Sequence, residues 1–91
     1  MKKDPLAMMR AAIDKEDNRL VQALDARMRI VKKIGAYKRV KNLPIVDKKR
    51  WAALMKKHVS AGAKRGLSPA IIRDVFSAIH KHSLSIEERR P

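Results

Sequence analysis

The sequence predicts an all-α fold of three helices, one of them very long, which together form an intertwined helical homodimer. Apolar residues recur at steps of three and four along most of the 91 residues, and no stretch has the alternation of a strand. The 4 prolines and 3 glycines fall mainly where helices are expected to begin or end. A chain this short buries a modest fraction of its surface, so it is often stabilised by association with another copy.

The first predicted helix runs from Leu6 to Lys38, with Asp4 suited to the N-cap and Pro5 to the first helical position. One face of this helix, which we call the seam, has residues at alternating steps of three and four. Its members are Arg10, Ile13, Asp17, Leu20, Leu24, Arg27, Val31, Ile34 and Lys38. Such a helix is about 50 Å long, which is more than the roughly 50 remaining residues can cover. We therefore expect a second copy of the chain to cover the rest of the seam.

The second predicted helix follows a connection that contains Pro44. Asp47 is its expected N-cap, the helix extends to about Lys64, and Gly66 is expected to cap its C-terminus. The inner face of this helix is expected to carry Trp51, Leu54, Met55, His58 and Ala61.

The third predicted helix begins with Ser68 at the N-cap and Pro69 at the first helical position. Its inner face is expected to carry Ile72, Val75, Phe76 and Ile79 and, continued by helical steps, Ser83 and Glu87. The apolar face of this helix therefore ends in polar groups. The seam of the first helix is likewise interrupted by charged residues.

Composition restricts the class of protein. There is no Cys, which excludes disulfides and thiolate metal sites. His80 and His82 lie two residues apart and do not share a helix face, so we expect no metal site. The sequence has no secretory signal pattern and no apolar run long enough to span a membrane. We therefore expect a cytoplasmic protein that does not enter a membrane.

The net charge of +14 has two interpretations. The first is a nucleic-acid-binding helical module, since excess positive charge favours polyanions. The second is a solvated basic surface around a site for a small anion. Phosphate-binding cations belong on an exposed face rather than on the seam. The placement of the charges therefore argues against nucleic acid as a partner.

Charged residues at core-facing positions point to a small anionic ligand. Four of them are cations, Arg10, Arg27, Lys38 and Arg50, and two are carboxylates, Asp17 and Glu87. Buried charges are costly unless they are paired, so the excess of positive charge predicts a site for a dicarboxylate or a phosphate. The alternatives are ordinary salt bridges for Arg27 and Lys38, an Asp47 partner for Arg50, and solvent exposure for Ser83 and Glu87.

The spacing of the cations predicts how the site is assembled. Arg27 and Lys38 are about 16 Å apart along a helix, so their long side chains can close on one small molecule. Arg10 lies about 25 Å from Arg27, too far to share that ligand within one chain. We therefore expect Arg10 to come from the other subunit, which gives two equal sites per dimer.

These residues also resemble a known family. The segment Met9–Asp14 is followed by Asp17, Leu20, Leu24 and Ala26-Arg27-Met28, then by Lys38, Leu43-Pro44-Ile45, Asp47 and Arg50, and finally by Gly66-Leu67-Ser68-Pro69, Ile72, Phe76 and Ser83. In this order, over nearly the whole chain, they resemble the all-helical (AroQ-type) chorismate mutases. The resemblance implies a single domain over residues 1–91 and an intertwined homodimer. It also implies conversion of chorismate to prephenate for aromatic amino-acid biosynthesis, without a cofactor.

The resemblance implies a role for each candidate residue. Arg10 of the partner chain, Arg27 and Arg50 would hold or support the two carboxylates of chorismate. Lys38 would donate to the ether oxygen whose bond breaks and to a carboxylate. Such a unimolecular rearrangement is accelerated by holding a compact conformer and by stabilising charge on that oxygen.

Three further roles follow from the same resemblance, together with two departures from the family pattern. Asp47 would meet the ring hydroxyl, Ser83 would bind near the ring carboxylate, and Glu87 would lie beside the ether oxygen. Many bacterial members have Gln in place of Glu87. An ionised Glu87 would repel the developing negative charge, so it must be protonated to help. Trp51 stands where the best-known bacterial pattern has a Glu that contacts the substrate hydroxyl.

Two related activities remain open because of Trp51. One is an isochorismate pyruvate lyase, which shares Arg10, Arg27, Lys38 and Arg50 and also has an apolar residue at the position of Trp51. The other is a mutase for the amino analogue of chorismate. Asp47 and the Leu43-Pro44-Ile45 connection favour the mutase.

Overall fold

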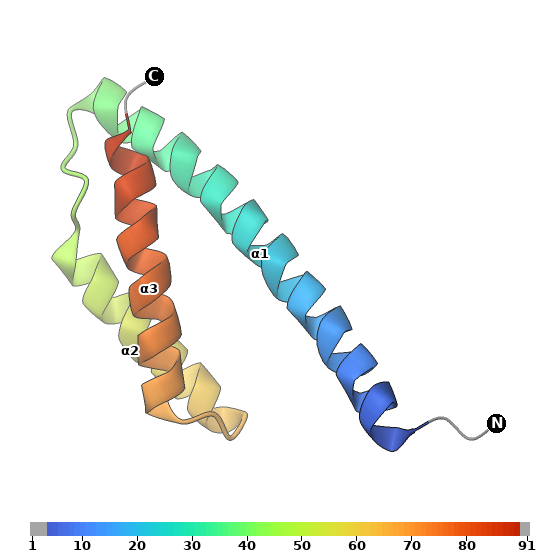
Figure 1. Cartoon of the computed structure of the whole chain (residues 1–91). Coiled ribbons are helices and arrows are strands. Elements are labelled where there is room, and N and C mark those ends of the chain that lie inside the picture. Colours follow the sequence, from blue (N-terminus) through green and yellow to red (C-terminus); the bar gives the residue numbers. More distant parts are fainter. Residues whose placement is uncertain (1–3, 90–91) are drawn as a thin grey trace. The chain divides into compact units, whose positions relative to one another are not determined.

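A computed structural model describes residues 4–89 of the chain, and three α-helices account for most of them (Figure 1). They are α1 (Pro5–Lys41), α2 (Lys48–Lys64) and α3 (Pro69–Glu88). Residues 4–89 contain no strand, so the all-α prediction is confirmed for this part of the chain. No helix among them is long and apolar enough to cross a membrane.

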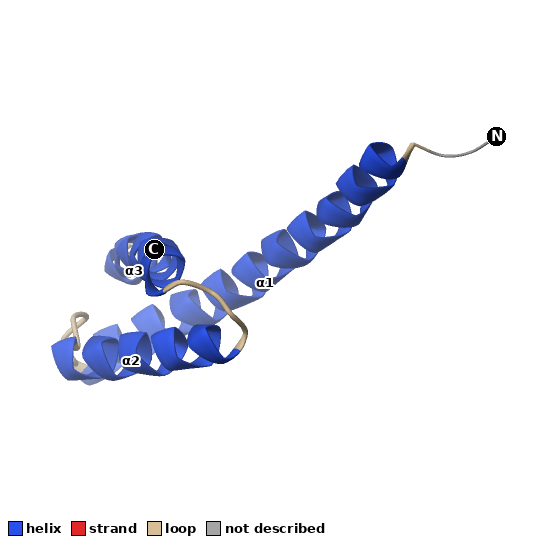
Figure 2. Ribbon diagram, turned by 90° about the horizontal axis from the view of Figure 1, so that it is seen from below, coloured by secondary structure: helices blue, strands red, loops and turns tan. Residues whose placement is uncertain are grey.

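The chain divides into two units, Met1–Ile30 and Val31–Pro91, of which residues 4–30 and 31–89 are described. The first unit contains the N-terminal part of α1. The second contains the last turns of α1 together with α2 and α3, whose ribbons can be followed in Figure 2.

Both ends of α1 are set by local hydrogen bonds. The Oδ1 atom of Asp4 accepts a hydrogen bond from the backbone N–H of Leu6 at 3.1 Å, which confirms the predicted cap. The helix ends at Lys41, three residues later than predicted. Asn42 adopts a left-handed φ of 54°, and the N–H of Leu43 then donates to the carbonyl of Lys38 at 2.8 Å. This geometry terminates helices at Gly or Asn, and it uses carbonyls that lack helical partners.

The boundaries of α2 agree with the prediction. Asp47 accepts a hydrogen bond from the N–H of Arg50 at 3.0 Å and is the N-cap. At the other end Gly66 has a φ of 77°, and its N–H donates to the carbonyl of Ala63 at 3.1 Å. The N–H of Leu67 donates to the carbonyl of Gly62 at 2.9 Å, which completes a Schellman motif.

The start of α3 also agrees with the prediction. The hydroxyl oxygen of Ser68 accepts a hydrogen bond from the N–H of Ile71 at 3.3 Å, and Pro69 occupies the first helical position. These caps explain why α3 begins only a few residues after α2 ends.

Two pairs of stacked rings join α2 to α3. Trp51 stacks on His80 with ring centroids 3.9 Å apart, and His58 stacks on Phe76 with centroids 4.1 Å apart. Flat rings in this arrangement bury large areas and add a specific contact to the general burial of apolar surface.

The inner faces of α2 and α3 differ from the prediction at two positions. Ala61 is exposed and Gly62 is buried instead, because α3 approaches so closely there that a Cβ atom on Gly62 would lie 2.7 Å from Cγ1 of Ile72. Val75, predicted to face inward, is 47% exposed. It lies at the margin of the contact, whereas Ile72, Phe76 and Ile79 are half-buried.

The apolar residues of the seam in the first unit are exposed. Ile13 is 59% exposed and Leu20 is 62% exposed, and among the apolar residues of the chain only Val31, in the second unit, is buried within residues 4–89. A unit made of one helix offers these side chains no apolar partner. The seam thus retains an unburied apolar stripe, as its length leads one to expect.

Candidate active site

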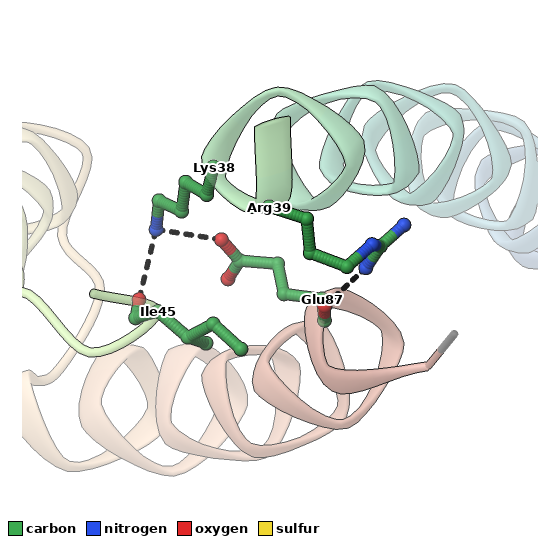
Figure 3. Close-up of polar contacts among 4 residues, drawn as sticks. All are labelled: Lys38, Arg39, Ile45 and Glu87. Atoms are coloured by element: carbon green, nitrogen blue, oxygen red, sulfur yellow. Dashed lines mark hydrogen bonds and ion pairs between the residues drawn. The ribbon is translucent and has the colours of Figure 1, made fainter. Parts of the chain in front are cut away.

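Lys38 and Glu87 form a close ion pair in the second unit (Figure 3). The distance from Nζ of Lys38 to Oε1 of Glu87 is 2.6 Å, and the side chains are only 19% and 9% exposed. Lys38 also donates a hydrogen bond to the carbonyl oxygen of Ile45 at 2.8 Å. One ammonium group therefore links the last turns of α1, the α1–α2 connection and the end of α3.

The main chain of Glu87 is held by two further residues of α1. Arg39 donates a hydrogen bond through Nη1 to the carbonyl oxygen of Glu87 at 2.8 Å. Gly35 is buried, and a Cβ atom built there would lie 2.8 Å from Cα of Glu87. Sequence reasoning missed both contacts. The available indication was that Gly35 is the sole glycine of the long first helix, a position where glycine weakens a helix unless close packing requires it.

Ser83 and Glu87 are the two buried polar residues among residues 4–89, as the inner face of α3 predicted. The hydroxyl of Ser83 donates to the carbonyl oxygen of Ile79 at 2.7 Å, a bond back to the preceding turn. Ser83 lies one turn before Glu87 on the same face of α3. The alternative interpretation, in which Ser83 and Glu87 are exposed to solvent, is therefore wrong.

Asp47, Arg50 and Trp51 lie together at the start of α2. Asp47 and Arg50 are exposed, and the carboxylate of Asp47 binds the backbone N–H of Arg50. Trp51 is half-buried against His80. The sequence interpretation gave His80 no role, although it lies one turn before Ser83 on α3.

Arg10 and Arg27 belong to the first unit, so they are described by their own surroundings. Arg10 is exposed and Arg27 is half-buried. Neighbouring charges on α1 pair within the helix, with Arg19 on Glu16 and Arg29 on Asp25, each at 3.1 Å.

The cluster in the second unit suits acid–base and electrostatic chemistry on an anion. It combines an ammonium donor with a carboxyl group at hydrogen-bond distance, both largely shielded from water. Shielding strengthens electrostatic interactions inside such a site. Among residues 4–89 no three His, Asp or Glu side chains are grouped so that they could hold a metal ion.

Two comparisons relate the chain to known proteins. The chain is 31% identical over 85 residues to a 4-amino-4-deoxychorismate mutase of Streptomyces pristinaespiralis. The aligned part covers 93% of this chain and 66% of that protein, so the chain spans slightly less than two thirds of its relative. The family model described as chorismate mutase type II matches residues 9–88. From Met9 to Glu88, the chain belongs to the chorismate mutase type II family.

Proposed function

We propose that the chain is a chorismate mutase, which converts chorismate to prephenate by a [3,3] rearrangement. The observation that carries the proposal is the shielded pair of Lys38 and Glu87, 2.6 Å apart, in a chain of this family. The rearrangement breaks an ether bond and forms a carbon–carbon bond within one molecule. The protein therefore needs to position the substrate and to stabilise charge rather than to form a covalent intermediate.

We assign the stabilisation of the ether oxygen to Lys38. An ammonium group has three N–H donors, and two of them bind Ile45 and Glu87. A third donor remains for a ligand. An ionised Glu87 can only accept hydrogen bonds, whereas its protonated form carries an O–H group that would donate to the same oxygen beside Lys38.

The arginines supply the binding of the two carboxylates. A guanidinium fork matches a carboxylate bidentately, which orients the substrate as well as binding it. In the proposed homodimer each site takes Arg27 and Arg50 from one chain and Arg10 from the other. The exposed apolar residues of the seam, such as Ile13 and Leu20, would be buried between the two chains.

A second substrate is favoured by one relative. The relative from Streptomyces pristinaespiralis acts, by its name, on the 4-amino analogue of chorismate. Trp51 presents an aromatic ring stacked on His80 where a carboxylate would contact a ring hydroxyl. Trp51 thereby removes a hydrogen-bond acceptor from the side of the ring that distinguishes the two substrates.

The test is to incubate the purified protein separately with chorismate, isochorismate and 4-amino-4-deoxychorismate. Prephenate from chorismate supports the proposal, and the corresponding rearranged amino product identifies the second substrate. Pyruvate from isochorismate would show a lyase instead. Arg27→Ala and Lys38→Ala should each abolish the rearrangement. Full activity in either variant would contradict the assigned site.

A further inference from the structure

Three residues of α1 contact one residue of α3. Lys38 and Arg39 are consecutive, yet they bind different atoms of Glu87: Lys38 its carboxylate at 2.6 Å and Arg39 its main-chain carbonyl at 2.8 Å (Figure 3). Gly35, one turn before Arg39, lies directly against the backbone of Glu87. Gly35 and Arg39 are four residues apart and so share one face of the helix.

The position of Glu87 in α3 makes the Arg39 contact important. Glu87 lies in the last turn of α3, which ends at Glu88, and carbonyls in a last turn have no partner within the helix. Helix ends fray for this reason. A charged donor at such a carbonyl forms a strong hydrogen bond and interacts favourably with the negative end of the helix dipole.

The same contact holds the part of the main chain from which the carboxyl group of Glu87 extends. A side chain can be held in one place only if its own main chain is fixed. Gly35 sets how closely the main chain of Glu87 approaches α1, and Arg39 keeps it there. Lys38 then meets the carboxylate from the adjacent position of α1.

We propose that Arg39 is a positioning residue for the rearrangement, acting through the main chain of Glu87 without contacting the substrate. The inference rests on the proposed mutase function, and it assigns Arg39 a role in turnover. Placement errors of about 1 Å at a catalytic group are sufficient to lower rates substantially.

The first experiment compares kcat and KM for Arg39→Ala, Arg39→Lys and the control Lys41→Ala. Lys41 lies in the same last turn of α1 but is exposed. We expect Arg39→Ala to lower kcat by about tenfold with little change in KM, because Glu87 acts in the transition state. Arg39→Lys, which keeps a charged donor, should recover part of the loss, and Lys41→Ala should match the wild type.

The second experiment repeats Arg39→Ala in a Glu87→Ala background. If Arg39 acts through the side chain of Glu87, its removal should have no further effect on kcat there. An equal fall in both backgrounds would overturn the inference, since it would show a structural role. Thermal unfolding identifies any variant that does not fold, and Arg39→Lys then replaces Arg39→Ala in both backgrounds.

The failures of the two proposals give different results. If the wild-type protein is active and Arg39→Ala has the same kcat, only the role of Arg39 is overturned. A wild-type protein that rearranges neither chorismate nor its amino analogue overturns the proposed function and the role of Arg39 together.

Discussion

At the scale of single residues, the chemistry centres on a carboxyl group whose protonation matters. Glu87 pairs with Lys38, and its side chain is 9% exposed. In the proposed reaction negative charge develops on the ether oxygen next to it. An ionised carboxylate there is repelled, whereas a protonated one donates a hydrogen bond.

This contrast predicts different effects for two substitutions of Glu87. Glu87→Gln keeps a neutral hydrogen-bond donor beside the ether oxygen, so we expect it to retain activity. Glu87→Ala removes the group, so we expect kcat to fall by roughly tenfold or more. The measurement is kcat at saturating substrate for the wild type and both variants, with thermal unfolding to show that each variant folds. An equal kcat in Glu87→Ala and the wild type would remove Glu87 from the ether-oxygen role.

At the scale of elements, the site depends on how closely the last turns of α1 approach α3. Gly35 makes this approach possible, because a Cβ atom there would lie 2.8 Å from Cα and 3.1 Å from the carbonyl oxygen of Glu87. Backbone atoms cannot rotate away as side-chain atoms do. Glycine at this position weakens the helix itself, but it allows α1 to pack closely against the backbone of Glu87.

Gly35→Ala should lower the free energy of unfolding by about 1–3 kcal/mol despite the better helix propensity of alanine. Gly62→Ala is the matched control, since its Cβ would meet side-chain atoms of Ile72 at 2.7 and 2.9 Å, which can move by rotation. Urea denaturation of both variants gives the comparison. If Gly62→Ala costs as much as Gly35→Ala, the close backbone contact is not what Gly35 provides.

How much could be predicted from the sequence depends on how far apart along the chain the interacting residues lie. Asp47, Gly66 and Ser68 were placed correctly because caps depend on residues two to five positions away. The end of α1 was placed too early, since Asn42 was not recognised as a left-handed terminator. The contacts of Gly35 and Arg39 join positions about fifty residues apart, and no local pattern encodes them.

At the scale of the whole molecule, the prediction concerns a second copy. The seam leaves Ile13 and Leu20 exposed, and the spacing argument assigns Arg10 to the site of the other chain. A site assembled from two chains has a genetic signature that a site within one chain lacks. Two variants that each lack a residue contributed by a different chain can form one intact site when they are mixed.

Mixing Arg10→Ala with Arg27→Ala, after unfolding and refolding together, should restore activity. Each mixed dimer then contains one site with an intact Arg27 and an intact partner Arg10, so about a quarter of all sites are active. Each variant refolded alone should be inactive. The readouts are turnover and the dimer mass by light scattering. If mixed dimers form but show no activity, both arginines of a site come from the same chain.

The stack of Trp51 on His80 has an optical consequence. Trp51 is the single tryptophan of the chain, so all indole emission arises where α2 meets α3. His80 precedes Ser83 by one turn and Glu87 by two on the same helix face. We therefore expect the intrinsic fluorescence of the native protein to change when a ligand occupies the proposed site, without any added label.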